Sequence, residues 1–293
     1  MMAYSVEDLI QLLDLEPLEQ NIYRGLNRDI GSGRIFGGQV LAQALVAARR
    51  TVKEEDRSAH SLHGYFILEG DLEIPVVYFV DRLRDGRSFT TRRVTAIQHG
   101  NAIFNMAASF HKTETGLSHQ STMPDVPPPE GLKSQLDTIR EHADRIPEGL
   151  RDLLTQDRPI DRRPIVPLDP FDPEPAEPIK HAWIRTVGDL GDDPLHHQAV
   201  LAYASDYGLL GSTLLPHSRT FYDPDLMGAS LDHAIWFHRP FRIDEWLLYV
   251  TESPVASGAR GFAHGSFFSR GGELVASVAQ EGVIRVRDKQ KEK

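Results

Sequence analysis

The chain carries an internal repeat whose period is more than half of its length. Three sets of residues recur at separations of 170, 173 and 171 positions: His63 and Phe66 with His233 and Trp236, residues 87–89 with 260–262, and Gly100 with Gly271. Solenoid repeats are shorter, roughly 20–50 residues, so a period of this size indicates duplication of a whole small domain. The sequence therefore predicts two copies of one unit that contains a helix and a sheet.

Each copy is expected to place a largely buried helix before a set of antiparallel strands. Residues 39–48 and 196–210 are small or apolar on almost every side, and such a helix must be covered on most of its surface. Segments typical of strands follow each helix, at 63–68, 76–81, 88–98 and 102–110, and then at 230–238, 245–252, 258–269 and 273–286. A short amphipathic helix is predicted to begin at Ser5 and to extend to Leu13. The expected fold class is α+β, with two antiparallel sheets that each wrap a central helix.

A proline-rich stretch separates the two copies. Twelve of the nineteen prolines lie between Pro124 and Pro178, and proline cannot join a central ladder because it lacks a backbone donor. We therefore expect an N-terminal domain over residues 1–115, a connector over 116–180 with one possible helix near 132–156, and a C-terminal domain over 181–293. Trp183 and several aliphatic residues favour a packed connector over a disordered linker.

Composition and missing motifs limit the chemistry. The net charge of −10 disfavours a general nucleic-acid binder, and an anionic ligand would need a local positive patch. The absence of cysteine excludes disulfides, thiolate nucleophiles and cysteine zinc sites. Phosphate-binding loops, HExxH metal sites and nucleophile elbows are missing too, since residues 228–232 break Gly-x-Ser-x-Gly at its last position. We expect no metal and no cofactor.

No segment resembles a targeting signal or a membrane span. The first eight residues are acidic rather than basic, and no run approaches the roughly 18 apolar residues of a membrane helix. Residues 291–293 do not form a peroxisomal signal. The expectation is a cytoplasmic protein without a membrane partner.

Asp206 is the strongest single candidate for catalysis. It falls within the second predicted helix, between small and apolar residues. A buried carboxylate is costly unless it is paired or used in chemistry. An exposed helix face, or a carboxylate satisfied by a backbone donor, would explain the residue equally well.

Two polar residues on predicted strands complete the candidate site. Gln280 shares a strand face with Leu274 and Val278, so its amide needs partners unless it reaches solvent at the strand end. Ser230 opens the predicted strand 230–238, where a serine is most often a local turn residue. It gains interest because that strand lies beside the other two elements in a sheet that wraps a helix.

Other polar residues favour structural interpretations. Asp232 and His233 look like an acid–base pair, but neighbours on a strand point to opposite faces and cannot share one site. We interpret His233, and its repeat partner His63, as structural. Arginines form two clusters that are either solvated faces or phosphate contacts: Arg82, Arg84, Arg87, Arg92 and Arg93 in the first copy, and Arg239, Arg242 and Arg260 in the second.

Eight ordered stretches carry a resemblance to a known family. They are Phe36-Gly-Gly-Gln-Val, His60-Ser-Leu-His, Leu83-Arg-Asp-Gly, Tyr203-Ala-Ser-Asp, and residues 231–241, 244–249, 257–262 and 275–283. With these stretches, the chain resembles the acyl-CoA thioesterase II family over nearly its whole length. The resemblance implies two fused hot-dog domains, hydrolysis of acyl-CoA to fatty acid and coenzyme A, and a role in fatty-acid metabolism.

The resemblance also implies a site. By motif position, Asp206, Ser230 and Gln280 would hold a hydrolytic water, with serine where some members of the family carry threonine. Asp206 alone can accept a proton and would be the base, and backbone N–H groups near the second helix would stabilise the oxyanion. Ser109 stands opposite Gln280 in the first copy, which implies one active site per chain. A homo-oligomer, dimer or tetramer, is also implied.

Two other functions remain open at this point. A hot-dog enoyl-CoA hydratase would need a histidine near its aspartate, and no histidine follows Asp206 before His217. A non-catalytic acyl-CoA-binding protein would not need the three polar residues together. Release of free thiol from acyl-CoA distinguishes a thioesterase from both.

Overall fold

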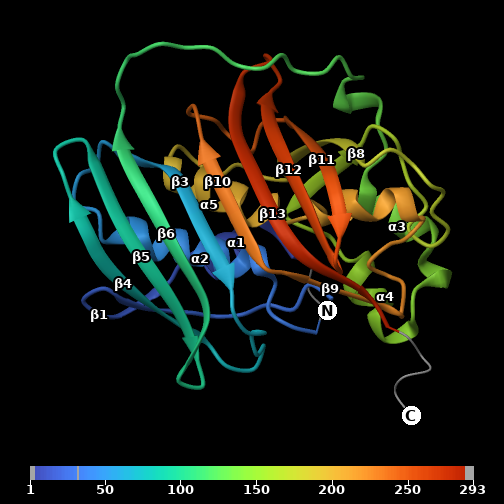
Figure 1. Ribbon diagram of the computed structural model, residues 1–293, viewed down its shortest axis with the longest axis horizontal. Coiled ribbons are helices and arrows are strands. Elements are labelled where there is room, and N and C mark those ends of the chain that lie inside the picture. Colours follow the sequence, from blue (N-terminus) through green and yellow to red (C-terminus); the bar gives the residue numbers. More distant parts are fainter. Residues whose placement is uncertain (1–3, 32, 288–293) are drawn as a thin grey trace.

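Thirteen strands form one antiparallel sheet that curves around a layer of helices in the computed structural model (Figure 1). The structure describes residues 4–31 and 33–287. The expectations about terminal signals rest partly on residues 1–3 and 291–293, which lie outside the described residues. The strands of the first half are β1 (Glu16–Glu19), β2 (Ile22–Gly25), β3 (Arg57–Phe66), β4 (Val76–Asp85), β5 (Phe89–Gln98) and β6 (Asn101–Lys112).

The strands of the second half repeat this arrangement and continue the same sheet. They are β7 (Ile160–Pro164), β8 (Ile179–Thr186), β9 (Leu226–Ser230), β10 (Asp232–Phe237), β11 (Leu247–Ser257), β12 (Arg260–Ser269) and β13 (Leu274–Val286). The order across the sheet is β1-β2-β4-β5-β6-β3-β10-β13-β12-β11-β8-β7, and β9 pairs with β13.

The two halves join at the centre of the sheet. There β3 pairs with β10, with Leu62 opposite Ile235. Without this pairing, both strands would be edges with unpaired backbone groups. The two sheets expected from the sequence are therefore one continuous sheet.

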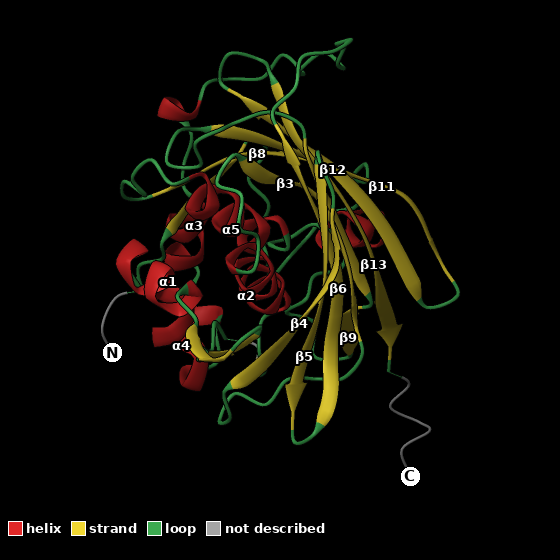
Figure 2. Ribbon diagram, turned by 90° about the vertical axis from the view of Figure 1, so that its left-hand side faces the viewer, coloured by secondary structure: helices red, strands yellow, loops and turns green. Residues whose placement is uncertain are grey.

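The α-helices lie on one face of this sheet (Figure 2). Two long helices, α2 (Gly37–Arg50) and α5 (Pro194–Ser205), lie side by side, one from each half. Shorter elements are α1 (Val6–Leu13), α3 (Gln135–Glu141), α4 (Glu148–Thr155) and the 3-10 turns η1 (Pro129–Gly131), η2 (Ala143–Arg145) and η3 (Leu210–His217). Each half thus wraps one buried helix, which confirms the α+β double hot-dog architecture expected from the sequence. No helix in the described part of the chain has both the length and the apolar character needed to cross a membrane.

Helix α5 ends earlier than the predicted range 196–210. It stops at Ser205, and Gly208 then adopts a left-handed backbone with a φ of 71°. Glycine accepts this conformation without the strain that a side chain would introduce. Asp206 is therefore the residue that ends α5, not a residue inside it.

The connector holds more regular structure than the sequence suggested. The single helix near 132–156 is in fact two short helices, because Pro147 cannot continue a helix that precedes it. Strand β7 was not predicted, and its Pro164 is tolerated because β7 is the last strand of the sheet. Strand β1 was also missed, because all four of its residues are exposed and show no alternation.

The two histidines matched by the repeat are not equivalent. His63 is exposed on the outer face, where its ring meets that of Trp236 edge-on with centroids 5.1 Å apart. His233 is fully buried on the inner face. His63 and His233 are thus 170 residues apart but lie on opposite faces of the sheet. This is because their strands carry different irregularities, including a register shift in β3 between Ala59 and Ser61.

Helices α2 and α5 approach each other closely at Gly38. A Cβ atom there would lie 2.4 Å from the carbonyl oxygen of Tyr203 in α5. No side chain fits at that distance from a backbone atom. The Gly37-Gly38 pair that begins α2 is therefore required by the crossing of the two helices.

We expect Gly38→Ala to lower the free energy of unfolding by about 1–3 kcal/mol, as overpacking does. The obstacle is backbone and cannot rotate away, so α2 must shift. Gly149→Ala in α4 is the matched control, because nothing lies within 4 Å of its Cβ position. That variant should keep or gain stability, by up to about 1 kcal/mol. Urea unfolding measures both, and equal losses would contradict the argument.

Candidate active site

Asp206 links the two halves of the molecule. Its Oδ2 atom accepts a hydrogen bond from the Gly38 N–H at 2.9 Å, at the amino end of α2. That helix has no side-chain cap of its own, since its N-cap residue is Phe36. Asp206 thus caps a helix from the other half, where the helix dipole favours negative charge. Only 7% of the Asp206 side chain is exposed.

Gln280 connects Asp206 with Ser230. Its Nε2 atom donates to Asp206 Oδ1 at 2.7 Å and to Ser230 Oγ at 2.8 Å. The amide orientation is fixed chemically, because a carboxylate can only accept a hydrogen bond. The structure therefore brings together the three side chains that the sequence analysis had singled out, from α5, β9 and β13.

Ser230 ends β9 rather than opening the predicted strand 230–238. On β13, Gly282 lies opposite Ser230 and Ala279 lies opposite Ala234. Between these two pairs the chain advances three residues on β13 but four residues on the partner strand. The partner therefore carries one extra residue, which is a β-bulge. The bulge shifts the alternation of side chains by one position between β9 and β10 (Asp232–Phe237).

The bulge brings His233 to the inner face beside Asp206. Asp232 instead turns away, and its Oδ1 accepts from the Glu281 N–H at 2.6 Å. The His233 Nδ1 atom lies 4.0 Å from Asp206 Oδ1, and its Nε2 lies 2.9 Å from Ser205 Oγ. Burial lowers the pKa of His233, against an opposing effect of Asp206, so the ring is neutral. Alternation along a strand correctly predicts that Asp232 and His233 point to opposite faces. Counted from Ser230, however, it places Asp232 rather than His233 on the face of the site.

The first half has no counterpart of Gln280. Ser109 lies on the outer face of β6, where its hydroxyl is 2.8 Å from His60 Nε2. The neighbouring inward residues of β6 are Ala108 and Phe110, and both are apolar and buried. Ser109 is therefore not the positional equivalent of Gln280, although the polar site is missing from this half.

A cavity of about 1400 Å³ opens beside the three residues, and Asp206 and Ser230 line it directly. Ligand cavities commonly measure roughly 300–1,000 Å³, so this one admits a long or bulky ligand. Apolar side chains such as Ile35, Phe66 and Leu154 form much of its wall. The proline-rich segment 164–173 forms another part, so the connector between the halves helps to build the site.

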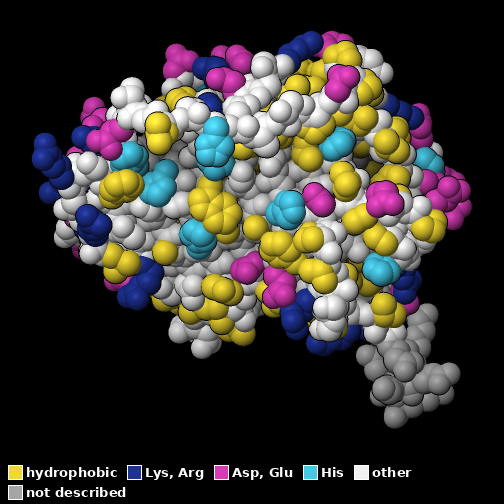
Figure 3. Space-filling model, turned by 45° about the horizontal axis from the view of Figure 1, so that its top comes forward, with side chains coloured by type: hydrophobic (Ala, Val, Ile, Leu, Met, Phe, Trp, Pro, Cys, Tyr) yellow, Lys and Arg dark blue, Asp and Glu magenta, His cyan; other side chains and the backbone are white. Residues whose placement is uncertain are grey.

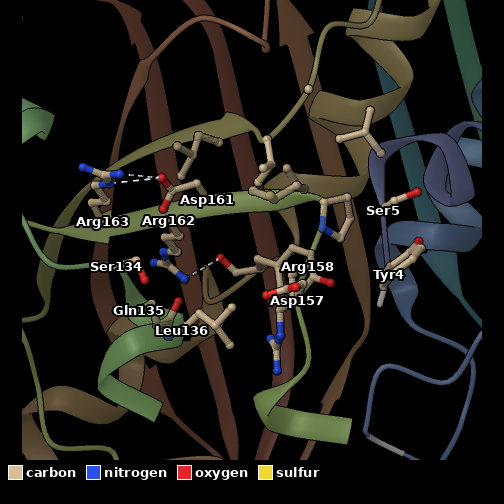
Figure 4. Close-up of a pocket in the computed structure, with 18 of the residues that line it drawn as sticks. Tyr4, Ser5, Ser134, Gln135, Leu136, Asp157, Arg158, Asp161, Arg162 and Arg163 are labelled. Atoms are coloured by element: carbon tan, nitrogen blue, oxygen red, sulfur yellow. Dashed lines mark hydrogen bonds and ion pairs between the residues drawn. The ribbon is translucent and has the colours of Figure 1, made fainter. Parts of the chain in front are cut away.

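A second cavity, of about 520 Å³, adjoins the first, with which it shares lining residues. Figure 4 shows Tyr4 and Ser5 on one side of it and Arg162 and Arg163 on the other. Arg163 is paired with Asp161 at 3.0 Å. Arg158 and Arg162 line both cavities. The two cavities therefore share a positively charged wall.

Four cations at the cavities have no carboxylate partner among the described residues: Arg158, Arg162, Lys180 and Arg287. Arg158 donates to the Leu154 carbonyl and Arg162 to the Tyr207 carbonyl, each at 3.1–3.2 Å. Burial, and the adjacent charge of Arg162, lower the pKa of Lys180 to about 7. The wall is thus suited to an anionic group.

The arginine clusters noted in the sequence lie elsewhere. Arg92 is buried, bonds Thr51 Oγ1 at 2.7 Å and pairs with Asp85, and Arg242 pairs with Asp189, Asp192 and Asp244. None of the eight clustered arginines lines either cavity. Arg158, Arg162 and Lys180, which do line them, come from the connector and β8. Their only sequence signal was isolated charge within a proline-rich stretch.

Two family patterns match the chain. One described as the acyl-CoA thioesterase N-terminal domain covers residues 26–111, and one described as acyl-CoA thioesterase covers residues 150–283. Together they span both halves of the sheet.

Proteins of the same kind resemble the chain over most of its length. Acyl-coenzyme A thioesterase 8 of Mus musculus is 44% identical, with 94% of this chain and 88% of that protein covered. Acyl-CoA thioesterase 2 of Haemophilus influenzae is 40% identical, with 97% and 99% covered. The crystal structure of acyl-CoA thioesterase II TesB2 from Mycobacterium marinum is 44% identical and superposes with a TM-score of 0.77, over 97% of this chain and 98% of that one. A hot-dog protein from Alicyclobacillus acidocaldarius is only 19% identical, yet its TM-score is 0.76 over 95% and 98% of the two chains, which supports the fold alone.

Proposed function

The chain belongs to the acyl-CoA thioesterase family, and from this premise we propose that Asp206 activates a water that attacks the thioester carbonyl of acyl-CoA. The enzyme is a thioester hydrolase. The observation that carries the proposed site is the contact of Gln280 with Asp206 and Ser230 at the wall of the large cavity.

The direction of the hydrogen bonds supports a position for the water. Both N–H groups of the Gln280 amide are used, one by Asp206 and one by Ser230. The Ser230 oxygen therefore accepts, and its own proton is free for donation. A water that donates to Asp206 and accepts from Ser230 keeps one lone pair for the thioester carbon. Asp206 takes the proton as the C–O bond forms, and the thiolate leaves with the electrons of the C–S bond.

The amino end of α2 is the better candidate for oxyanion stabilisation. The expected donors near the second helix do not fit this role, because Asp206 lies at the carboxyl end of α5, where free carbonyls rather than N–H groups accumulate. Helix α2 points its amino end at Asp206 through Gly38. Its partial positive charge would lie where the carbonyl oxygen becomes negative.

Free thiol is the product that tests this function. Incubation with acyl-CoA and a thiol-reactive dye should release one thiol for each fatty acid formed. A hydratase would leave the thioester intact and add water to an enoyl chain, and a binding protein would do neither. His233 is fully buried and does not line the cavity, so it is not placed to act on an enoyl chain.

A single turnover in ¹⁸O-labelled water separates direct water attack from a covalent route. Attack by Asp206 itself would form an anhydride, and its hydrolysis would leave label in the enzyme carboxylate. Direct attack leaves label only in the fatty acid. We expect the second result, because Asp206 is held by Gly38 and Gln280 and is not free to approach the carbonyl.

The unpaired cations at the cavity wall favour contact with the phosphates of coenzyme A. The chain carries a net charge of −10, so an anionic substrate needs a local positive site. Arg158, Arg162 and Lys180 supply one within the same cavity as Asp206.

We expect Lys180→Met to raise KM for acyl-CoA by about 3- to 10-fold with little change in kcat, the effect of losing one charge-assisted contact. Lys180 is charged below its pKa of about 7 and neutral above it, so the wild-type KM should rise between pH 6 and pH 8. The variant should lose this dependence. Lys133→Met is the control, since Lys133 pairs with Glu141 and lines neither cavity. A KM unchanged by Lys180→Met would contradict the assignment.

The remaining proposals concern organisation. We propose one active site per chain, an N-terminal domain that ends near residue 115, a C-terminal domain that begins near residue 181, and a cytoplasmic location.

Histidine and hydrophobic side chains lie across the middle of one face of the molecule, with lysine and arginine mostly toward its margins (Figure 3). Tyr65 and Trp236 are exposed on the outer face of the sheet. An exposed face of this composition is consistent with a homo-oligomer, which sedimentation would test.

A further inference from the structure

Two buried polar atoms beside the active site lack hydrogen-bond partners among the described residues. They are Oε1 of Gln280 and Nδ1 of His233. Both side chains have no exposed surface. A buried polar atom without a partner costs free energy, so the two require an explanation, and they lie in the same place.

The strand register makes the two side chains direct neighbours. Ala234 on β10 lies opposite Ala279 on β13 in an antiparallel pair, so the next position places His233 opposite Gln280. Both point to the inner face, and side chains paired in this way are within reach of one another. Gln280 also acts on His233 as a hydrogen-bonding neighbour that raises its pKa, although burial outweighs it.

The other side of the imidazole ring limits where its proton lies. His233 Nε2 is 2.9 Å from Ser205 Oγ, and the same hydroxyl is 2.9 Å from the Ala202 carbonyl. Ser205 has one proton to donate. If that proton goes to Ala202, the ring proton lies on Nε2, and Nδ1 and Gln280 Oε1 face each other as two acceptors. If the proton goes to Nε2, the ring carries its proton on Nδ1, and Nδ1 can then act as the donor that Gln280 Oε1 lacks.

We propose that His233 is a positioning residue of the thioesterase site, which donates its Nδ1 proton to Gln280 Oε1 and so fixes the orientation of the Gln280 amide. This inference rests on the proposed roles of Asp206, Ser230 and Gln280. The amide can flip about its last bond, and a flip would turn an oxygen toward the Asp206 carboxylate. A donor on the opposite side of the amide prevents the flip, and it keeps both N–H groups directed at Asp206 and Ser230.

Three variants separate this role from a purely structural one. In Asn, the side-chain nitrogen is as many bonds from Cα as Nδ1 of histidine; in Gln, it corresponds to Nε2. His233→Ala should lower kcat about 10- to 100-fold, the cost of a misplaced catalytic group, with KM nearly unchanged. His233→Asn should recover most of kcat, because it restores the donor to Gln280. His233→Gln should not, because it restores only the contact with Ser205.

Each outcome decides the inference. If His233 served only to hold β10 against α5 through Ser205, His233→Gln would restore activity and melting temperature better than His233→Asn, and that order overturns the proposal. A kcat of His233→Ala within twofold of wild type does so too. In a Gln280→Ala background, His233→Ala should cause no further loss of kcat. If Gln280→Ala itself keeps wild-type kcat, the proposed catalytic site fails, independently of His233.

¹⁵N NMR of the wild-type enzyme, which needs no variant to fold, should show the His233 proton on Nδ1, and a proton on Nε2 would overturn the proposal.

Discussion

Replacement of Asp206 by asparagine should lower kcat for acyl-CoA hydrolysis by about 10²- to 10⁴-fold, the usual contribution of a general base. Asparagine keeps the size of the side chain but cannot accept the proton of the attacking water. Asparagine also has one acceptor oxygen, whereas the carboxylate has two. In the wild type both accept a hydrogen bond, Oδ2 from the Gly38 N–H and Oδ1 from the Gln280 amide. One of these contacts must be lost in the variant. Steady-state assays that follow thiol release measure the effect.

The control for this variant makes the same chemical change at another helix cap. Asp193 begins α5, and its side chain accepts from the Leu195 N–H at 2.9 Å. It is exposed and lines neither cavity. Asparagine is as good an N-cap as aspartate, so Asp193→Asn should keep kcat. If Asp206→Asn folds normally and keeps wild-type kcat as well, the assignment of the base is refuted.

The sequence indicated that the helix around Asp206 is covered, but it left open whether the carboxylate is exposed or is held by a backbone donor. The small and apolar residues around it indicated a covered helix, and a covered carboxylate needs a partner. One of its two partners is the backbone N–H of Gly38, 168 positions away in the other copy. The repeat showed that two helices exist, but nothing in either copy showed that the end of one caps the start of the other. That relation depends on how closely α2 and α5 cross.

The face of His233 could not be predicted because alternation along a strand assumes an unbroken register. Residues 230–238 read as one strand, and in an unbroken strand Ser230 and Asp232 would share a face. The extra residue between Ser230 and Ala234 reverses this relation. The bulge could not be recognised from the sequence, because no glycine marks it and the residues within it are Leu231 and Asp232.

The charge of the cavity wall also escaped the sequence analysis. A cluster of arginines in the sequence drew attention to β4 and β5, but those side chains are used in local pairs such as Arg92 with Asp85 and Arg93 with Asp81. Arg162 and Lys180 stand apart in a proline-rich stretch, and only folding brings them together. A cluster of arginines in the sequence thus does not indicate that these arginines lack carboxylate partners. That depends on which side chains lie next to each cation in the folded protein.

The second large effect should come from Gln280→Glu, a change of almost no size. Glutamate would place a carboxylate about where the amide nitrogen now lies, 2.7 Å from Asp206 Oδ1 and 2.8 Å from Ser230 Oγ. Two carboxylates at that distance cannot both ionise, so the pair would hold one proton near neutral pH. The Ser230 proton would turn toward the new carboxylate and would no longer reach the water.

We therefore expect kcat of Gln280→Glu to fall by about 10²-fold or more at pH 7, the cost of misplaced catalytic groups. The fall should lessen as pH rises, because the shared proton is then lost and Asp206 can act as base again. The acid limb of the pH–rate profile should thus move to higher pH. Gln280→Met is the control: it removes both N–H donors without adding charge, so it should lower kcat at every pH and move the acid limb much less than Gln280→Glu does. If Gln280→Glu and Gln280→Met give parallel profiles, Gln280 does not contact the base during turnover, and the water must be held by other groups.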